Sequence, residues 1–278
     1  MNAREVVFEG WRAMELSNDR YTLVLPLDVG LRILHCSLRA GPNILYVDAA
    51  CKGQKGGSQW RLYGGHRLWF APEHMEESYE PDNDSVEIHL TNTSARFLQR
   101  PGERTAFAKE MEISFAGESV EIVHRARNCG NSPKPISLWS ITALAGGGRG
   151  ILPVQNRVGA GLNPTAAVIV WPYTSMNDSR LTFGATDLEI AQRPSAPLKL
   201  GVSPLPGRMT LRYVRPDCIF EKSFSTGPGP YPDLGTAAQC YTNETLLELE
   251  ALGPTRTCAP GQILEFAETW TLRPVTPA

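Results

Sequence analysis

The sequence predicts an all-β fold of antiparallel sheets packed face to face. Three observations point to this class. Glycine (25 residues) and proline (22 residues) are frequent and scattered along the 278-residue chain, with short β-rich runs between them. Several runs alternate apolar and polar residues, which is typical of a sheet with one wet face. Helical periodicity is poor throughout, and the best helical candidate is a turn or two at residues 71–78.

The clearest strands form a predicted antiparallel hairpin. Over residues 109–115, apolar side chains share one face, and glutamate and serine occupy the other. A short turn leads into residues 118–127, where the apolar face includes His124. Because it lies among apolar neighbours, we expect His124 to be buried.

A further strand is predicted at residues 262–272, and its apolar face carries one carboxylate, Glu268. A carboxylate in an apolar row must find a partner or shift its pKa. We expect a structural ion pair or hydrogen bond here, and not a catalytic role.

Residues 242–254 predict a strand with two contrasting faces. One face is apolar and should pack against the core, whereas the other carries Glu248 and Glu250. Like charges two residues apart on one face raise each other's pKa, and a carboxyl with a raised pKa is a good general base. The alternative is an ordinary strand face exposed to solvent. Taken alone, the pattern of charges on this strand favours that alternative.

Length and charge limit the kind of protein. No linker or repeat divides the chain, so we predict a single domain over residues 1–278. Its core should be large enough to be stable without disulfides or structural metals. The net charge is -2, and Lys and Arg form no run. Because nucleic acid and anionic lipid need a basic surface, neither is a predicted partner. No apolar run is long enough to span a membrane. Oligomeric state is left open.

The cysteines and the N-terminus indicate a reducing compartment. None of the six cysteines lies in a CxxC pair, so neither a zinc ribbon nor a thioredoxin-type site is predicted. Met1-Asn-Ala-Arg-Glu5 lacks the apolar segment of a secretory signal. We therefore expect a cytoplasmic protein in which the thiols are free and buried like small apolar residues.

The segment at 63–73, Tyr-Gly-Gly-His-Arg-Leu-Trp-Phe-Ala-Pro-Glu, is the strongest site candidate. Glycine pairs let the backbone turn sharply or approach a ligand. His66 can exchange protons near neutral pH, Arg67 offers a planar fork for hydroxyls or anions, Trp69 an apolar face, and Glu73 two acceptor oxygens. In a regular strand His66 and Arg67 would face opposite ways, so part of the segment is predicted to be loop.

Two other interpretations of this segment stay open. In the first, Trp69 is core, Arg67 pairs with Glu73, and His66 is a buried imidazole with its hydrogen bonds made. In the second, His66, Glu73, His74 and Glu76 bind a divalent metal, but their spacing matches no zinc pattern. We therefore predict no metal and no cofactor.

A third candidate region is residues 135–150. Trp139 and Arg149 are predicted to line a pocket. Ser140 has no activating partner and no GxSxG elbow, which excludes a serine hydrolase of that type. The glycine run that follows lacks the Lys-Ser/Thr ending of a P-loop, so we read it as a loop.

In this order, these segments resemble the galactose-mutarotase-like superfamily, a β-supersandwich that binds sugars in a cleft on a concave sheet. The double glycine is similar to that of its hexose-phosphate epimerase branch, and Gly-Gly-His-Arg-Leu-Trp with Pro-Glu is similar to a bacterial subgroup. The resemblance covers nearly the whole chain, and it rests on these segments: 14–18, 21–34, 63–73, Leu246-Leu-Glu-Leu-Glu250, 258–261 and 268–272.

The resemblance implies an aldose or hexose epimerase. In that family a carboxylate takes the proton of the anomeric hydroxyl while a histidine protonates the ring oxygen. Here Glu248 is the implied base and His66 the implied acid. The sequence departs from the pattern at residues 137–141, where the family carries a histidine and this chain has none.

The expected ligand is therefore a small molecule, most simply a sugar. Arg67, Trp69, Glu73, Trp139, Arg149 and Glu250 are the expected binding residues. Two alternatives remain: a carbohydrate-binding protein without turnover, or a lyase or isomerase of another polar metabolite that uses the same cleft.

Overall fold

The computed structural model describes residues 1–39, 41–154 and 162–275, and it is built almost entirely from antiparallel strands. Three sheets are present. A small sheet runs in the order β1-β2-β3-β5, a ten-stranded sheet in the order β14-β15-β12-β17-β18-β22-β10-β9-β8-β7, and an eight-stranded sheet in the order β13-β16-β19-β20-β11-β6-β4, with β21 paired to β11. The helical part of the described chain is one 3-10 turn, η1 (Ala49–Cys51).

The strands of the small sheet are β1 (Asn2–Phe8), β2 (Trp11–Ser17), β3 (Tyr21–Pro26) and β5 (His35–Leu38). Those of the eight-stranded sheet are β4 (Arg32–Ile33), β6 (His66–Ala71), β11 (Lys134–Ala145), β13 (Val168–Val170), β16 (Leu198–Val202), β19 (Ala238–Thr242), β20 (Leu246–Leu252) and β21 (Arg256–Cys258). Those of the ten-stranded sheet are β7 (Glu87–Leu90), β8 (Ser94–Gln99), β9 (Phe107–Ala116), β10 (Ser119–Asn128), β12 (Arg149–Pro153), β14 (Leu181–Phe183), β15 (Asp187–Ala191), β17 (Gly207–Val214), β18 (Cys218–Thr226) and β22 (Ile263–Pro274).

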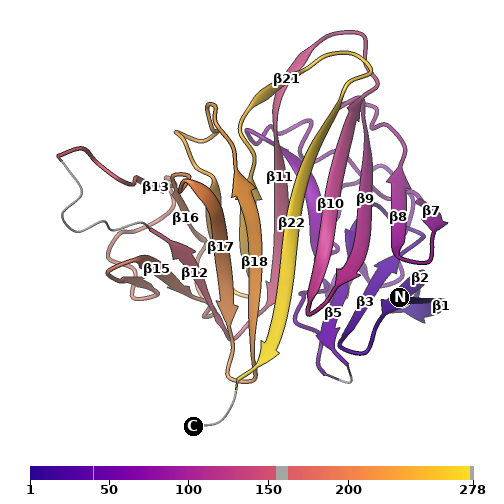
Figure 1. The fold of residues 1–278 in the computed structure, drawn as a ribbon, viewed down its shortest axis with the longest axis horizontal. Helices are drawn as coiled ribbons and strands as arrows, with labels where there is room; N and C mark the ends of the chain where they lie inside the picture. Colours follow the sequence, from indigo (N-terminus) through magenta and orange to yellow (C-terminus); the bar gives the residue numbers. More distant parts are fainter. Residues whose placement is uncertain (40, 155–161, 276–278) are drawn as a thin grey trace.

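The two large sheets lie face to face with the main core between them. In Figure 1 the long strands β18, β22, β10 and β9 stand side by side across the middle of the molecule, with β1, β2 and β3 at the N-terminal side. One continuous cluster of buried apolar side chains draws on strands from β2 to β22. Burial of this apolar area is the main source of stability for such a sandwich.

The predicted strands are confirmed, with small changes at their ends. The hairpin is β9 and β10, and His124 is buried as expected. Glu268 in β22 is buried at 2% exposure and bonded to neighbouring side chains. The helical candidate at residues 71–78 is a single turn: Ala71 ends β6, and the Ser78 N–H then donates to the carbonyl of His74 at 2.8 Å.

The thiols follow expectation with one exception. All six cysteines are free, and five are buried, but Cys129 is exposed in the turn that follows β10. Burial raises the pKa of the Cys36 and Cys240 thiols, which keeps them protonated and inert. Across the described residues, no helix is long and apolar enough to cross a membrane.

Candidate functional site

A cleft of about 540 Å³ opens on the side of the eight-stranded sheet that faces away from the core. Its floor and walls come from strands that are far apart in the sequence but neighbours in the sheet. The lining residues are mostly aromatic or charged: Trp60, Leu62, Arg67, Trp69, Glu73, Tyr79, Trp139, Ile141, Tyr173, Pro197, Lys199, Tyr241, Asn243, Leu246, Glu248 and Glu250.

Strand β6 begins at the double glycine for a steric reason. Gly64 and Gly65 both have positive φ, at 95° and 68°. A Cβ atom would lie 2.2 Å from the Tyr46 carbonyl oxygen at Gly64 and 2.1 Å from the Ile33 carbonyl oxygen at Gly65. Only glycine fits both positions, so the pair fixes where β6 enters the sheet.

From there β6 is a regular strand, and its side chains alternate between the cleft and the core. Arg67 and Trp69 line the cleft, whereas His66 points into the interior. Part of the segment 63–73 is loop as expected, since residues 63–65 and 72–73 lie outside the strand, whereas residues 66–71 are regular. In the neighbouring strand β11, Trp139 is paired with Trp69, and the two rings meet edge to face with 5.5 Å between their centroids. Two indoles therefore form one wall of the cleft.

Arg67 is held between a ring and a carboxylate. Its guanidinium lies 4.6 Å from the centroid of the Trp69 ring, and its Nη1 donates to Glu248 Oε1 at 3.2 Å. The side chain of Glu248 is 12% exposed, so a ligand in the cleft can reach it. Arg67 pairs with Glu248, and not with Glu73 as one interpretation of the sequence proposed.

Glu250 sits two residues further along β20, on the same face. Lys199 of β16 donates to Glu250 Oε2 at 2.9 Å, and the indole N–H of Trp139 donates to the same oxygen at 2.8 Å. Burial raises the pKa of Glu250, and the nearby Lys199 ammonium opposes that rise. Glu250 Oε1 is buried without a hydrogen-bond partner in the described structure, so it remains an acceptor beside the cleft.

Lys199 itself lies between two indoles. Its Nζ is 4.8 Å from the ring centroid of Trp139 and 4.8 Å from that of Trp171. Together with the bond to Glu250, these contacts hold the ammonium in one place.

The loop after β6 closes one side of the cleft. Tyr79 donates from its hydroxyl to Glu73 Oε1 at 2.5 Å, and its ring contacts Trp60 and Trp69 at centroid distances of 5.0 and 5.4 Å. Burial and the Glu73 carboxylate raise the pKa of Tyr79, which keeps the phenol protonated. Glu73 and Tyr79 both line the cleft.

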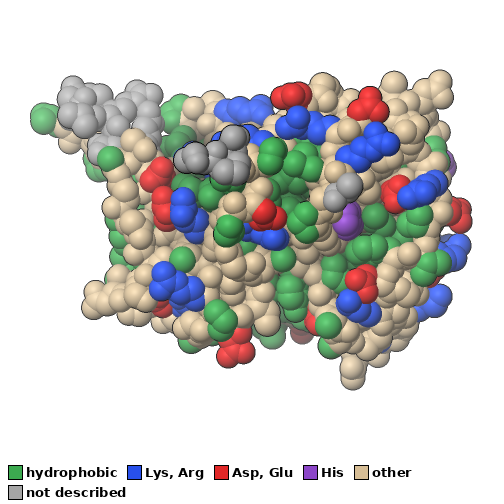
Figure 2. All heavy atoms as spheres, turned by 90° about the horizontal axis from the view of Figure 1, so that it is seen from below, with side chains coloured by type: hydrophobic (Ala, Val, Ile, Leu, Met, Phe, Trp, Pro, Cys, Tyr) green, Lys and Arg blue, Asp and Glu red, His purple; other side chains and the backbone are tan. Residues whose placement is uncertain are grey.

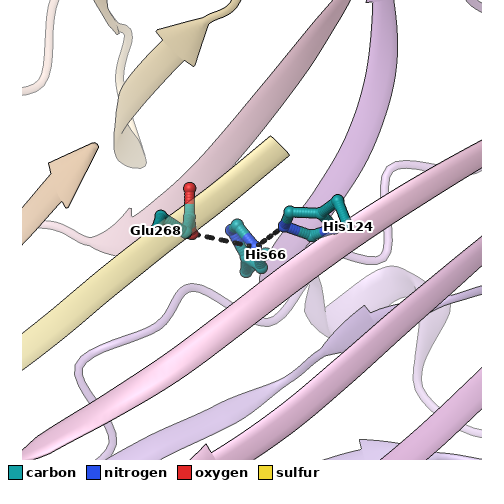
Figure 3. A group of neighbouring side chains, drawn as sticks. All are labelled: His66, His124 and Glu268. Atoms are coloured by element: carbon teal, nitrogen blue, oxygen red, sulfur yellow. Dashed lines mark hydrogen bonds and ion pairs between the residues drawn. The ribbon is translucent and has the colours of Figure 1, made fainter. Parts of the chain in front are cut away.

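His66 is not part of the cleft, which corrects the predicted pairing with Glu248. Its ring is fully buried on the opposite face of β6, where it contacts His124 and Glu268 (Figure 3). Its Nδ1 also lies 3.0 Å from the hydroxyl oxygen of Thr142. Burial holds the pKa of His66 well below its ordinary value, and the nearby Lys222 ammonium acts in the same direction. With the sheet between them, His66 cannot protonate a ligand held at Glu248.

Arg149 also lies elsewhere. It is on β12 of the ten-stranded sheet, where it forms an ion pair with Glu189 at 3.2 Å, and it does not line the cleft. The four residues considered as metal ligands in the sequence differ in their burial: His66 is buried, whereas Glu73, His74 and Glu76 are exposed. Of the predicted residues, the structure therefore brings together Arg67, Trp69, Glu73, Trp139, Glu248 and Glu250.

Sequence reasoning missed Lys199, Trp60, Tyr173 and Tyr241, which also line the cleft. Lys199 carried a usable signal. It is the one charge in the apolar strand Leu198-Lys-Leu-Gly-Val202, much as Glu268 is the one charge on the apolar face of β22. Trp60, Tyr173 and Tyr241 carried no such signal, because no local sequence pattern shows that their segments lie beside β6.

The molecule has the fold of the galactose-mutarotase-like proteins. It is similar to the Slr1438 protein of Synechocystis sp. PCC 6803 (TM-score 0.62, 16% identity, 96% of this chain and 98% of that one). It is also similar to a galactose mutarotase related enzyme of Lactobacillus acidophilus (0.54, 11%, 94% and 97%) and to a galactose mutarotase-like protein of Lactobacillus casei ATCC 334 (0.52, 11%, 94% and 100%).

At these identities the likeness establishes the fold alone. No family model matches the sequence, and no curated protein matches it. The residues of the cleft therefore have to carry any statement about function.

Proposed function

We propose that the cleft binds the ring of a carbohydrate and that the protein is an isomerase of the aldose 1-epimerase type. The observation that carries this proposal is the floor of the cleft, where Glu248 and Glu250 share one face of β20, each beside a cation. The indoles of Trp69 and Trp139 stand next to them. Aromatic faces suit the C–H face of a sugar, while carboxylates and cations suit its hydroxyls. A mutarotase-related enzyme with this fold supports the assignment.

The reaction would open and close a cyclic hemiacetal. Glu248 removes the proton from the anomeric hydroxyl, and the Lys199–Glu250 pair delivers a proton to the ring oxygen. The bond between the anomeric carbon and the ring oxygen breaks, and an aldehyde forms. After rotation about the adjacent C–C bond, the reverse transfers close the other anomer. Because burial raises the pKa of Glu250, this carboxyl can carry a proton closer to neutral pH than an exposed one.

The other cleft residues would position the ring. Arg67 and Glu73 offer a donor and an acceptor to the ligand, and Trp139 adds an apolar face beside Glu250. In this scheme the Lys199–Glu250 pair takes the place of the histidine that the family pattern carries on its middle strand. Arg149 and His66 have no part in it.

NMR measurement of anomer interconversion over a panel of neutral and phosphorylated sugars tests the proposal. We expect the wild type to accelerate at least one sugar, and Glu248→Gln and Glu250→Gln to lower that rate by about 10²–10⁴-fold. Glu189→Gln is the matched control, since Glu189 lies outside the cleft and should change nothing. A wild-type rate equal to the uncatalysed rate for every sugar would refute the epimerase.

A second candidate is a carbohydrate-binding protein without turnover. It is favoured by the ion pairs of the cleft, which engage both carboxylates. Titration calorimetry separates the two candidates: a sugar that binds but is not interconverted supports this second one. If no sugar in the panel binds, both are excluded.

A further inference from the structure

Beneath the floor of the cleft, on the interior face of the sheet, three side chains from three strands converge (Figure 3). The Nε2 atoms of His66 in β6 and His124 in β10 lie 2.9 Å apart. The Oε1 atom of Glu268 in β22 lies 3.3 Å from His66 Nε2. All three donor atoms fall within 4.8 Å of one another, and none of the side chains is more than 2% exposed.

The two separations from His66 Nε2 are close to those of a metal coordination shell. Bonds of about 2.0–2.2 Å from a tetrahedral cation to nitrogen and oxygen place neighbouring donors roughly 3.3–3.5 Å apart. The 3.3 Å contact already fits, and the 2.9 Å contact needs to open by about half an ångström.

Hydrogen bonding leaves one buried ring nitrogen of the histidine pair, His124 Nδ1, without a partner in the described structure. A neutral imidazole has one N–H and one lone pair. Only one proton can lie between the facing Nε2 atoms. In the described structure His124 Nδ1 has no partner, so the contact at Nε2 has to fix this ring by itself.

The surrounding contacts would orient these side chains as ligands. His66 Nδ1 lies 3.0 Å from the Thr142 hydroxyl, and the Trp270 indole N–H donates to Glu268 Oε1 at 2.7 Å. Ser140 donates to the other oxygen, Oε2. Outer contacts of this kind normally hold metal ligands in place and set which ring nitrogen faces the ion.

Lys222 is the competing cation. Its Nζ lies 3.3 Å from Glu268 Oε2 and 3.0 Å from Thr142 Oγ1, the same hydroxyl oxygen that lies 3.0 Å from His66 Nδ1. Oε1 is left facing His66. The ammonium would weaken the binding of a second cation, but it does not occupy the position between the three donors.

We propose that His66, His124 and Glu268 form a buried structural site for one first-row divalent cation, Zn²⁺ foremost. Two imidazoles and one carboxylate are a donor set that zinc and cobalt accept. Because His66 belongs to the eight-stranded sheet and the other two ligands to the ten-stranded sheet, the ion would join the two main layers of the fold. This site is separate from the cleft and does not depend on its function.

Metal analysis of the full-length protein tests the site. We expect close to one equivalent of zinc in protein purified without chelator. After unfolding with EDTA and refolding with Co²⁺, we expect visible d–d absorption at one equivalent of cobalt and a higher melting temperature than in the metal-free protein.

His124→Ala should abolish the cobalt absorption, and His89→Ala, at an exposed histidine on β7, should leave it unchanged. If His124→Ala fails to fold, the wild-type measurement still decides. Wild-type protein without stoichiometric zinc that also takes up no cobalt would overturn the proposal. It would also be overturned if His124→Ala folds and retains the cobalt absorption.

Discussion

At the scale of single residues, the Lys199–Glu250 pair is the feature on which the cleft most depends. Both side chains are almost fully buried, and Glu250 receives two of its hydrogen bonds from Lys199 and Trp139. A buried ion pair contributes little stability compared with two apolar residues in its place. Removing only one partner, however, leaves a buried charge without compensation.

We therefore expect Lys199→Met to lower the free energy of unfolding by about 3 kcal/mol, measured by urea denaturation. The double variant Lys199→Met/Glu250→Met should recover at least half of that loss, since no buried charge is left without a partner. Equal stability of the wild type and the single variant would show that the carboxylate is not buried as described.

The residues of this site differ in how far the sequence reveals them. Glu248 and Glu250 follow from strand alternation, because an apolar face on β20 leaves only the other face for carboxylates. His66 does not follow, because alternation puts it opposite Arg67 but says nothing about which face meets the cleft. That choice is made by distant strands, which no local pattern describes.

At the scale of elements, the outer face of the ten-stranded sheet shows how charge joins strands. Arg125 of β10 bonds to Glu110 and Glu112 of β9 at 2.6 and 2.8 Å, and to Glu265 of β22 at 2.9 Å. The hydrogen bond from Arg125 lowers the pKa of Glu112 below its ordinary 4.5. A carboxyl whose pKa is lower in the folded state stabilises the fold above its unfolded pKa and loses that contribution as the pH falls.

Stability should therefore decline as the pH falls from about 5 through the folded pKa of Glu112. We expect Arg125→Met to lower the free energy of unfolding by about 1 kcal/mol at pH 7 and to flatten this acid dependence. Urea denaturation at a series of pH values measures both effects. Arg208→Met, at an exposed position on β17 of the same sheet, is the comparison, because it leaves the contacts of Glu112 in place. An unchanged acid slope in Arg125→Met would contradict the assignment.

The elements themselves were largely predictable. Hairpins such as β9–β10 are local, so apolar alternation and a turn are enough to place them. The order of the strands in each sheet was not predictable. The neighbours β20, β11 and β6 are separated by many residues, and pairing between distant strands has no local signature in the sequence.

At the scale of the whole molecule, charge is mixed over the surface. On the face shown in Figure 2, Lys and Arg side chains are interspersed with Asp and Glu, in keeping with the net charge of -2. Such a surface gives no electrostatic attraction for a polyanion, which leaves the cleft as the main candidate for recognition.

A ligand of the cleft should stabilise the whole fold, because it binds only when distant strands are assembled. A sugar at about 100 times its dissociation constant should raise the free energy of unfolding by about 2.7 kcal/mol. Thermal unfolding should show this as a rise of several degrees in the wild type and a smaller one in Glu248→Gln. Equal shifts in the two proteins would place the ligand outside the cleft.

Strand β6 presents Arg67 and Trp69 to the cleft and His66 and Leu68 to the interior. Insertion or deletion of a single residue at its start would exchange the two sets, since side chains on a strand alternate with a period of two. The guanidinium would then lie in the hydrophobic interior and the imidazole in solvent. This short stretch therefore tolerates substitutions far better than changes of length, and an insertion library across the gene should be depleted here more sharply than in the surface turns.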